Sequence, residues 1–526
     1  MRTLLFALLL LPSVTYAGQT ATGFVFHDEN QNSIKDSGEK GIASVLVSNG
    51  TEVVATDDNG AYELKVTDDT ILFVIQPKGW GVPVNEFNLP QFYYIHKPNG
   101  SPEGLEYPGV SPTGPLPDSV DFPLNPSETG EKFSLFAFGD PQPYTIDDVD
   151  YFRRDIVEEA RELKGPVAGV SLGDIVGDDL DLFHKMNAVT ALMDRPWWHV
   201  YGNHDMNFDA KEGKYADETF ESIYGPPVYA FQISDVVFVA LDNVLFPYKN
   251  HRYMGGFDEW QLTFLENLLE HIPSDKLIVT MMHIPLYDEG YTESKSFLDE
   301  DRKKFFALFK DHPHTLSLSA HTHTQNHHFF DHDHDHWPHL DVPHHHYNVG
   351  TTSGNWWSGD KDERGIPVTT MRDGTPNGYA ILNFEGNTYT YDYKVANAPS
   401  DYVMSIYAPK ALYPHSYGNG LLAVNFFNGS EQAKVEYRIN ERKWKTAKHT
   451  KAPDPQYTYN RLKRDQISTP SPDKPLSYPV ESNHIWIGSV PSRLEPGIHT
   501  IQVRITDRFG RVFEDSTTYR IIEENK

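Results

Sequence analysis

The pattern of apolar and polar positions changes twice along the chain and divides it into three parts. Residues 23–126 carry short alternating or β-branched runs separated by Asn-Gly and Asp-Asn-Gly hairpin signals, which predicts an all-β module. In residues 133–396 apolar strands alternate with segments of helical period such as 146–163, which predicts βαβ units in a layered α/β domain. After residue 396 the helical period stops, and short strands predict a third, all-β domain.

We therefore expect an α/β core between two β domains. The stretch 497–510 is typical of the last hairpin of an immunoglobulin-like sandwich, and we expect the N-terminal domain to be an immunoglobulin-like sandwich as well. The expected boundaries are 1–17 for a signal peptide, 18–126 for the N-terminal domain, 132–396 for the catalytic domain and 397–526 for the C-terminal domain.

The first seventeen residues are typical of a secretory signal. Arg2 precedes a short apolar run, and small residues at Thr15 and Ala17 give a cleavage point after Ala17. The alternative is a short buried helix. No later apolar run in the sequence is long enough to cross a membrane. We expect an exported protein, periplasmic or secreted after cleavage.

Composition narrows the chemistry. The net charge of −29 disfavours a nucleic-acid polymer as partner, because the surface would repel phosphate backbones. The absence of cysteine excludes disulfides, thiolate metal sites and cysteine nucleophiles. Histidine, by contrast, is abundant, with 25 residues.

Five polar clusters each follow a predicted strand of the middle domain. Alone, each has an ordinary explanation, such as a helix cap or a hydrogen-bonded histidine. Together they combine carboxylate, amide and imidazole groups that suit two divalent ions such as Mn²⁺, Fe²⁺ or Zn²⁺. The clusters are Asp140-Pro141-Gln142, Asp174 to Asp178, Gly202-Asn203-His204-Asp205, His283 and His321-Thr322-His323.

The spacing suggests how two ions would be used. Two ions ~3.5–4 Å apart need a bridging carboxylate, for which Asp174 is suited, and they would make hydroxide from a bridging water at neutral pH. His204 would then be free to protonate the leaving oxygen.

These motifs resemble the signature of the calcineurin-like metallophosphoesterases, in order and in residue type. The resemblance implies an αββα sandwich with a dinuclear metal site, and the three-part layout is similar to that of exported bacterial members. It implies His204 as proton donor, oriented by Asp205 or Asp178. The first motif departs from the usual Asp-x-His because it carries Gln142, and Ala320 replaces a glycine before the last motif. The implied ligands are Asp140, Gln142, Asp174 and His323 for one ion, and Asp174, Asn203, His283 and His321 for the other.

Loops after the last motif are candidates for a substrate wall. Trp356 or Trp357 would stack on substrate, and Arg364 or Arg372 would pair with phosphate; packing of the tryptophans on the C-terminal domain is the alternative. His346 closes a histidine triplet near this region and is a further pocket candidate. The preceding Asp-His repeat, residues 331–336, is either a metal-capturing segment or a solvated loop of low complexity.

The N-terminal module contains oxygen-bearing side chains at alternate positions. Asp28, Asn30, Asn32 and Asp36 resemble a Ca²⁺ loop, as in secreted B-type repeat domains, although Ser33 stands where such loops favour glycine. The alternative is an Asx-rich surface turn.

The sequence thus predicts an exported dinuclear metal-dependent hydrolase of phosphomonoesters or phosphodiesters, acting on a small-molecule, lipid or glycan substrate. One alternative is a pyrophosphatase acting on nucleotide-sugars or lipid pyrophosphates. Another is a surface glycan-binding protein with a vestigial metal site. The oligomeric state is left open.

Overall fold

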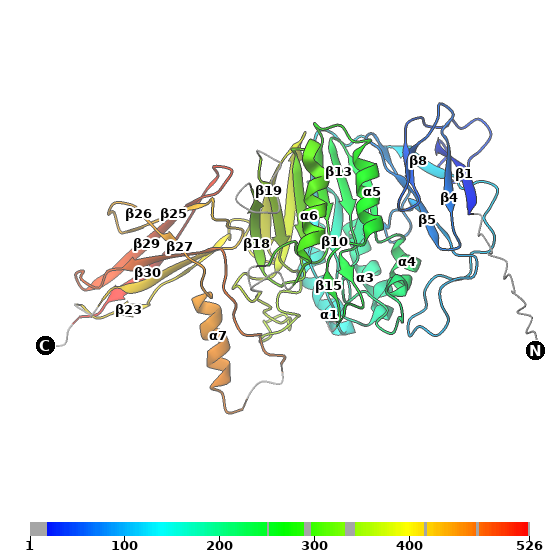
Figure 1. Cartoon of the computed structure of the whole chain (residues 1–526). Helices are drawn as coiled ribbons and strands as arrows, with labels where there is room; N and C mark the ends of the chain where they lie inside the picture. Colours follow the sequence, from blue (N-terminus) through cyan, green and yellow to red (C-terminus); the bar gives the residue numbers. More distant parts are fainter. Residues whose placement is uncertain are drawn as a thin grey trace, which may run out of the picture.

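The computed structural model of the chain describes residues 18–249, 252–288, 296–331, 342–414, 418–469 and 473–523. The predicted signal peptide and most of the Asp-His repeat lie outside these ranges. Figure 1 shows a β-rich N-terminal part at one end, a mixed α/β core in the middle and a β-rich C-terminal part at the other end.

The N-terminal part contains two four-stranded sheets, ordered β4-β1-β8-β6 and β3-β2-β5-β7. The predicted alternation in residues 61–66 is realised in the burial pattern of β4, where Tyr62, Leu64 and Val66 point inward. The strands are β1 (Gln19–His27), β2 (Leu46–Ser48), β3 (Val53–Ala55), β4 (Ala61–Val66), β5 (Thr70–Ile75), β6 (Trp80–Gly81), β7 (Tyr93–His96) and β8 (Phe122–Pro126).

Two sheets form the core, ordered β11-β10-β9-β20-β21 and β12-β13-β16-β17-β19-β18. The central strands of each sheet run parallel, as expected for βαβ units. The first sheet contains β9 (Lys132–Phe138), β10 (Pro166–Leu172), β11 (Trp197–Val200), β20 (Gly378–Glu385) and β21 (Thr388–Val395). The second contains β12 (Tyr229–Ile233), β13 (Val236–Ala240), β16 (Leu277–Met281), β17 (Thr315–Ser319), β18 (Gln325–Phe330) and β19 (His344–Val349).

Aromatic side chains join the two sheets. Trp198 on β11 stacks on Phe231 on β12, with ring centroids 4.0 Å apart. On the other side of the first sheet, Phe138 packs edge-to-face on Phe152 of α1; Phe306 of α6 lies 4.8 Å from Phe330 of the second sheet. The helices are α1 (Ile146–Phe152), a π-helical turn (Arg153–Val157), α2 (Glu158–Ala160), α3 (Phe183–Thr190), α4 (Glu218–Tyr224), α5 (Glu259–Leu269) and α6 (Asp299–Leu308); a short hairpin pairs β14 (Val244–Leu245) with β15 (Met254–Gly255).

The C-terminal part has its own apolar core between two further sheets, ordered β22-β24-β28-β27 and β23-β30-β29-β25-β26. The expected last hairpin is β29 paired with β30. Helix α7 (Pro455–Asp465) projects from this part in Figure 1. The strands are β22 (Met404–Tyr407), β23 (Ala411–Leu412), β24 (Gly420–Phe426), β25 (Lys434–Ile439), β26 (Lys445–Thr446), β27 (Lys448–His449), β28 (Ile485–Val490), β29 (Gly497–Thr506) and β30 (Val512–Ile521).

A buried lysine joins the N-terminal part to the core. The Nζ atom of Lys97, which follows β7, lies 2.5 Å from Glu218 Oε2 and 2.7 Å from Glu221 Oε2 on α4, and 3.2 Å from Asp69 Oδ1. Burial alone would lower the pKa of Lys97, but the adjacent carboxylates raise it well above its ordinary value. The lysine therefore stays charged and neutralises carboxylates that would be costly to bury alone.

Candidate active site

The five predicted clusters meet where the parallel strands of the two sheets end. Asp140, Asp174 and Asn203 follow β9, β10 and β11 of the first sheet, and His283 and His321 follow β16 and β17 of the second. Because the carboxyl ends of parallel strands share one edge, ligands gather there in such sheets.

The backbone at this edge is left-handed at most of the predicted positions. Residues other than glycine rarely adopt positive φ, and each such residue costs of order 1–3 kcal/mol. The conformation turns successive side chains toward a common centre instead of letting the strand continue. The residues and their φ values are Asp140 (33°), Gln142 (38°), Asp174 (48°), Asp178 (73°), His321 (69°) and His323 (53°).

Glycine is required where two of these turns meet a neighbouring backbone. A Cβ on Gly139 would lie 1.9 Å from the carbonyl oxygen of Gly350, and one on Gly202 would lie 2.1 Å from the amide nitrogen of Asp174. The two backbone segments lie so close together at these points that no side chain fits between them.

One group of side chains converges on His283. Its Nε2 atom lies 3.1 Å from Asn203 Oδ1, 3.2 Å from Asp174 Oδ1 and 3.2 Å from His321 Nδ1. The ligand atoms of Asp174, His283 and His321 all lie within 4.8 Å of one another. This arrangement could hold one metal ion.

A second group lies around Asp140. Its Oδ1 atom is buried, has no hydrogen-bond partner and lies 3.9 Å from the Nε2 atoms of both His283 and His323. His323 Nε2 lies 2.9 Å from the amide oxygen of Gln142. A buried carboxylate oxygen without a partner is costly unless a cation satisfies it, so the donor set fits a second ion.

Two backbone carbonyls set the tautomers of the histidines. His283 Nδ1 lies 2.8 Å from the carbonyl oxygen of Leu172, and His323 Nδ1 lies 2.6 Å from that of Gly354. A proton on each Nδ1 leaves the Nε2 lone pair directed at the centre. Burial lowers the pKa of His321 and of His323 to about 3, which keeps both rings neutral and able to ligate.

The two central carboxylates differ in their tendency to ionise. Burial and the charge of Asp174 raise the pKa of Asp140. Burial also acts against ionisation of Asp174, but the imidazoles of His283 and His204 outweigh it and lower the pKa of Asp174. Asp174, which lies between the two groups, therefore carries the negative charge most readily.

His204 stands beside this centre with its ring partly exposed, at 22% of the side chain. Its Nδ1 lies 2.7 Å from Asp178 Oδ1, and its backbone N–H donates to Asp174 Oδ1 at 2.8 Å. Burial would lower the pKa of His204, but the charges of Asp174 and Asp178 raise it, so the ring can hold a proton near neutral pH. Asp178 is the residue positioned to orient this ring.

Asp205 has a different environment from the one expected. It is fully buried, and its carboxylate accepts hydrogen bonds from the backbone N–H groups of Val176 and Gly202 at 3.2 and 2.9 Å. It therefore holds the two loops together rather than the His204 ring.

The expected substrate residues separate into two groups. Trp356 stacks on His323 with centroids 4.0 Å apart, and the backbone N–H of Arg372 donates to the carbonyl oxygen of His323 at 3.3 Å, so both border the centre. Trp357 is buried and donates from Nε1 to the carbonyl of Pro141, which anchors the first loop.

Arg364 and His346 are engaged elsewhere. Arg364 is held by Asp155 and Asp362 at 2.6 and 2.8 Å. His346 lies inside the second sheet, where its ring contacts Ser317 Oγ at 2.6 Å. Burial lowers its pKa well below the ordinary value, and the ring is a polar core residue of β19.

Tyr144, two positions after Gln142, is a further residue of the site that was not predicted from the sequence. Its hydroxyl accepts from Gln142 Nε2 at 3.2 Å, and its ring lies 6.1 Å from that of His204. The ring packs on Gly177, where a Cβ would approach it to 2.8 Å. The signal in the sequence was an aromatic residue two positions after a ligand motif.

The predicted calcium loop is closed by its own side chains. The side-chain amides of Asn30 and Asn32 donate to Asp36 Oδ2 at 2.7 and 2.8 Å, and Asp28 accepts from the backbone of Ser33. Glu39 accepts a hydrogen bond from the backbone N–H of Asp36 and stands eleven residues after Asp28, where an EF-hand loop places its last carboxylate.

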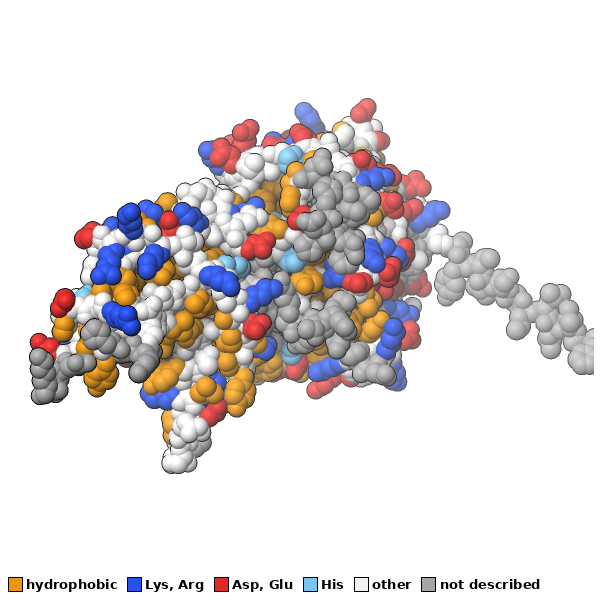
Figure 2. Space-filling model, turned by 60° about the vertical axis from the view of Figure 1, so that its left-hand side comes forward, with side chains coloured by type: hydrophobic (Ala, Val, Ile, Leu, Met, Phe, Trp, Pro, Cys, Tyr) orange, Lys and Arg blue, Asp and Glu red, His pale blue; other side chains and the backbone are white. Residues whose placement is uncertain are grey.

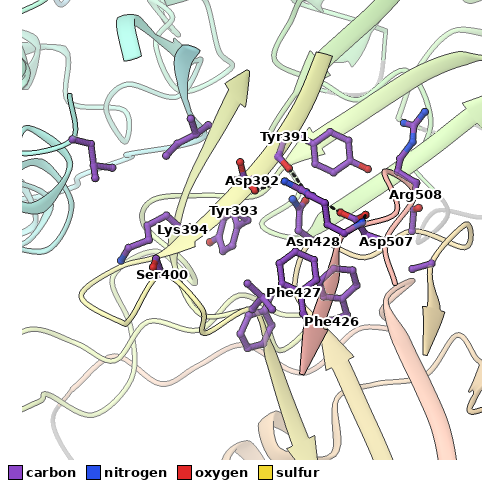
Figure 3. A pocket seen from close by; sticks show the side chains of 17 residues that line it. Tyr391, Asp392, Tyr393, Lys394, Ser400, Phe426, Phe427, Asn428, Asp507 and Arg508 are labelled. Carbon is purple, nitrogen blue, oxygen red and sulfur yellow. Dashed lines mark hydrogen bonds and ion pairs between the residues drawn. The ribbon is translucent and has the colours of Figure 1, made fainter. Parts of the chain in front are cut away.

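A cavity of about 310 Å³ lies between β21 and the C-terminal part (Figure 3). Its wall is largely apolar, and the charges of Arg511 are satisfied by Asp392 and Asp507 at 2.7 Å each. None of the residues that line it belongs to the centre described above. Among the described residues, no helix has the length and apolarity that a membrane span needs.

Comparison with solved structures gives distant matches. A purple acid phosphatase, PPD1, from yellow lupin (Lupinus luteus) seeds is 12% identical, with 67% of each chain covered and a TM-score of 0.36. A cold-active protein-tyrosine phosphatase of the psychrophile Shewanella sp. is 10% identical; the match covers 61% of this chain and 95% of that one, with a TM-score of 0.21. The search of curated proteins gave no match.

Family models match three consecutive stretches. The calcineurin-like phosphoesterase model matches residues 133–325, which include all five clusters. The models for the N terminal and the C terminal of calcineurin-like phosphoesterase match residues 28–108 and 346–513. The chain belongs to the calcineurin-like phosphoesterases that carry both an N-terminal and a C-terminal domain.

Proposed function

We propose that this protein is an exported phosphoesterase that uses two divalent metal ions, most readily Mn²⁺, Fe²⁺ or Zn²⁺, to hydrolyse a phosphomonoester or phosphodiester. The observation that carries the proposal is the buried, unpartnered Oδ1 of Asp140, 3.9 Å from two imidazole nitrogens whose tautomers are set for ligation. The αββα order implied by the resemblance is supported by the aromatic contacts between sheets and with the helices.

The ligand assignment follows the two groups of side chains. Asp140, Gln142 and His323 would hold one ion, and Asn203, His283 and His321 the other, with Asp174 between them. Ions bound there would act as Lewis acids on phosphoryl oxygens and would lower the pKa of a water molecule.

Side chains of the protein supply the proton and position the ligands. His204, oriented by Asp178, donates a proton to the oxygen that leaves phosphorus. Trp356 stacks on His323 and restricts the movement of that ring. Asp205 fixes the spacing of the loops that carry Asp174 and Asn203, because it bonds to the backbone of both loops.

The test uses metal-stripped protein supplied with Mn²⁺, Fe²⁺, Zn²⁺ or Mg²⁺ in turn. We expect metal-dependent hydrolysis of p-nitrophenyl phosphate or bis-p-nitrophenyl phosphate, and the ratio of the two rates separates a monoesterase from a diesterase. His204→Ala should lower kcat roughly 10²–10⁴-fold with unchanged metal content. His312→Ala, at a buried histidine outside the centre, is the matched control.

The competing reading is a surface glycan-binding protein with a vestigial metal site. Asn203→Ala would leave glycan binding intact under that reading and would abolish hydrolysis under ours. Absence of both bound metal and turnover in the wild type would overturn the proposal. Export is tested by the N-terminus of the mature protein, which we expect to be Gly18.

A further inference from the structure

Two cations, Lys474 and Arg252, lie on the aromatic rings that border His204. The Nζ atom of Lys474 lies 5.2 Å from the ring centroid of Tyr144, and the guanidinium carbon of Arg252 lies 3.4 Å from that of Phe208. Both rings meet the His204 ring edge-on, at centroid distances of 6.1 and 6.5 Å. The proton donor is thus bordered by two cation–aromatic pairs.

Neither cation has a carboxylate within ion-pair distance in the part of the chain that the structure describes. The hydrogen bond of Lys474 goes to the carbonyl oxygen of Trp356, at 3.1 Å. Asp148 is close enough to act on the charge of Lys474, but desolvation outweighs it and lowers the pKa of the lysine. In a chain of net charge −29, positive charge left without a carboxylate at the active-site rim indicates an anionic ligand.

Lys474 is brought to this rim by the C-terminal part. The segment 474–480 is bonded to core loops at three backbone positions: Gly359 N–H donates to the carbonyl of Lys474 at 2.8 Å, and Val480 N–H to that of Arg372 at 3.1 Å. Ser477 N–H donates to Asn355 Oδ1 at 3.0 Å. On the face shown in Figure 2, Lys and Arg side chains outnumber Asp and Glu over the C-terminal part, which is consistent with its supplying positive charge.

We propose that Lys474 and Arg252 bind a negatively charged leaving group, so that the same phosphoesterase centre hydrolyses a phosphoanhydride, whose leaving group is itself a phosphate, in preference to an ester with an uncharged leaving group. The inference rests on the proposed function, because it takes the position of His204 as the leaving-group side. Both cations are carried by flexible side chains, and the aromatic rings beneath them limit their movement.

The bond changes balance as a hydrolysis. The oxygen of a water molecule forms the new bond to the attacked phosphorus and releases one proton to solvent, from which His204 is later reprotonated. The bond from that phosphorus to the bridging oxygen breaks. The electron pair of the broken bond goes to the leaving phosphate, whose bridging oxygen takes the proton from His204. The two cations neutralise the charge that the leaving phosphate gains.

The inference is tested first by binding, which does not need turnover. Isothermal titration calorimetry on the metal-loaded protein compares imidodiphosphate, a non-hydrolysable P–N–P compound, with orthophosphate. We expect Lys474→Gln and Arg252→Gln each to weaken imidodiphosphate binding about tenfold while orthophosphate binding stays unchanged. Lys463→Gln is the matched control, because Lys463 is an exposed lysine over the ring of Tyr459 on α7, away from His204.

Kinetics give the second readout. The same variants should lower kcat/KM for ADP about tenfold and leave that for p-nitrophenyl phosphate unchanged. Equal losses on both substrates, or unchanged imidodiphosphate binding, would overturn the inference. Failure of the proposed function would instead show as a lack of metal-dependent turnover in the wild type, while the calorimetric comparison still decides the role of the two cations.

Discussion

Asp178 and Asp205 are equivalent in the sequence, each close to a ligand motif, yet they occupy different environments. Asp178 is 43% exposed and touches His204 Nδ1, whereas Asp205 is completely buried and accepts two backbone N–H groups. Sequence alone left the orientation of His204 to either residue. Substitution of Asp178 should therefore affect catalysis, whereas substitution of Asp205 should affect stability.

For Asp178→Asn we expect kcat to fall by up to about tenfold, because an amide neither fixes the tautomer nor stabilises the protonated ring of His204. Metal content and melting temperature should match those of the wild type. Steady-state kinetics with metal analysis checks this, and an unchanged kcat would contradict the role of Asp178.

Asp205→Ala should act on stability. It leaves two buried N–H groups without acceptors, at roughly 1–3 kcal/mol each. The free energy of unfolding from urea titration should fall accordingly, and the exposed Asp209→Ala serves as control. A loss of activity with unchanged stability would place Asp205 in the chemistry instead.

At the scale of elements, the sequence was informative where apolar runs end. The strands β9, β10 and β16 are largely apolar runs, and each is followed by one of the predicted polar clusters, as expected of buried parallel strands. The left-handed turns that follow could not be predicted, since Asp, Gln and His in those positions are imposed by the surrounding fold.

His346 shows why a strand rich in histidine misleads. On β19, His344 and His346 face Ser317 on β17, and Asn348 faces Ser319, so polar side chains pair across two strands inside the sheet. Polarity in sequence normally indicates exposure, and only the partner strand shows that these groups satisfy one another. Arg364 likewise has a partner that its sequence surroundings do not show, because Asp155 lies 209 residues away.

The loop 28–39 is the predicted Ca²⁺ site, which is separate from the proposed dinuclear centre. We expect millimolar Ca²⁺ to raise the melting temperature of the protein, since its oxygen ligands at positions 1, 3, 5, 9 and 12 follow the EF-hand order. Differential scanning calorimetry of the wild type and of Asp28→Asn/Glu39→Gln, with Ca²⁺ or with chelator, checks this. An equal shift in both proteins would show that calcium acts elsewhere on the acidic surface.

At the scale of the whole molecule, the flanking parts are attached to the core by buried polar contacts. Lys97 joins the N-terminal part to α4, and at the other end His484 lies 3.1 Å from the fully buried Asp373. These contacts link segments far apart in the chain, so hydrophobic period gives no sign of them.

Lys97→Met should be strongly destabilising, by about 3–5 kcal/mol, because it leaves the carboxylates of Glu218 and Glu221 without their cation. Lys78→Met removes a half-exposed pair with Asp235 across the same interface and should cost at most ~1 kcal/mol. Urea denaturation of both variants checks the difference. Equal effects would mean that Lys97 is not buried in solution.

The left-handed residues at the strand ends have a consequence for the whole chain. Six residues of the centre have a backbone conformation that is unfavourable for residues other than glycine, and the packing around them maintains it. Ions bound as proposed would offset this cost. Metal affinity and folding stability are then linked. Ions bound as proposed would raise the free energy of unfolding, and changes that destabilise the packing around the strand ends would weaken metal binding. Substitutions in either β domain that destabilise this packing should therefore raise the dissociation constant for metal, although they lie far from every ligand.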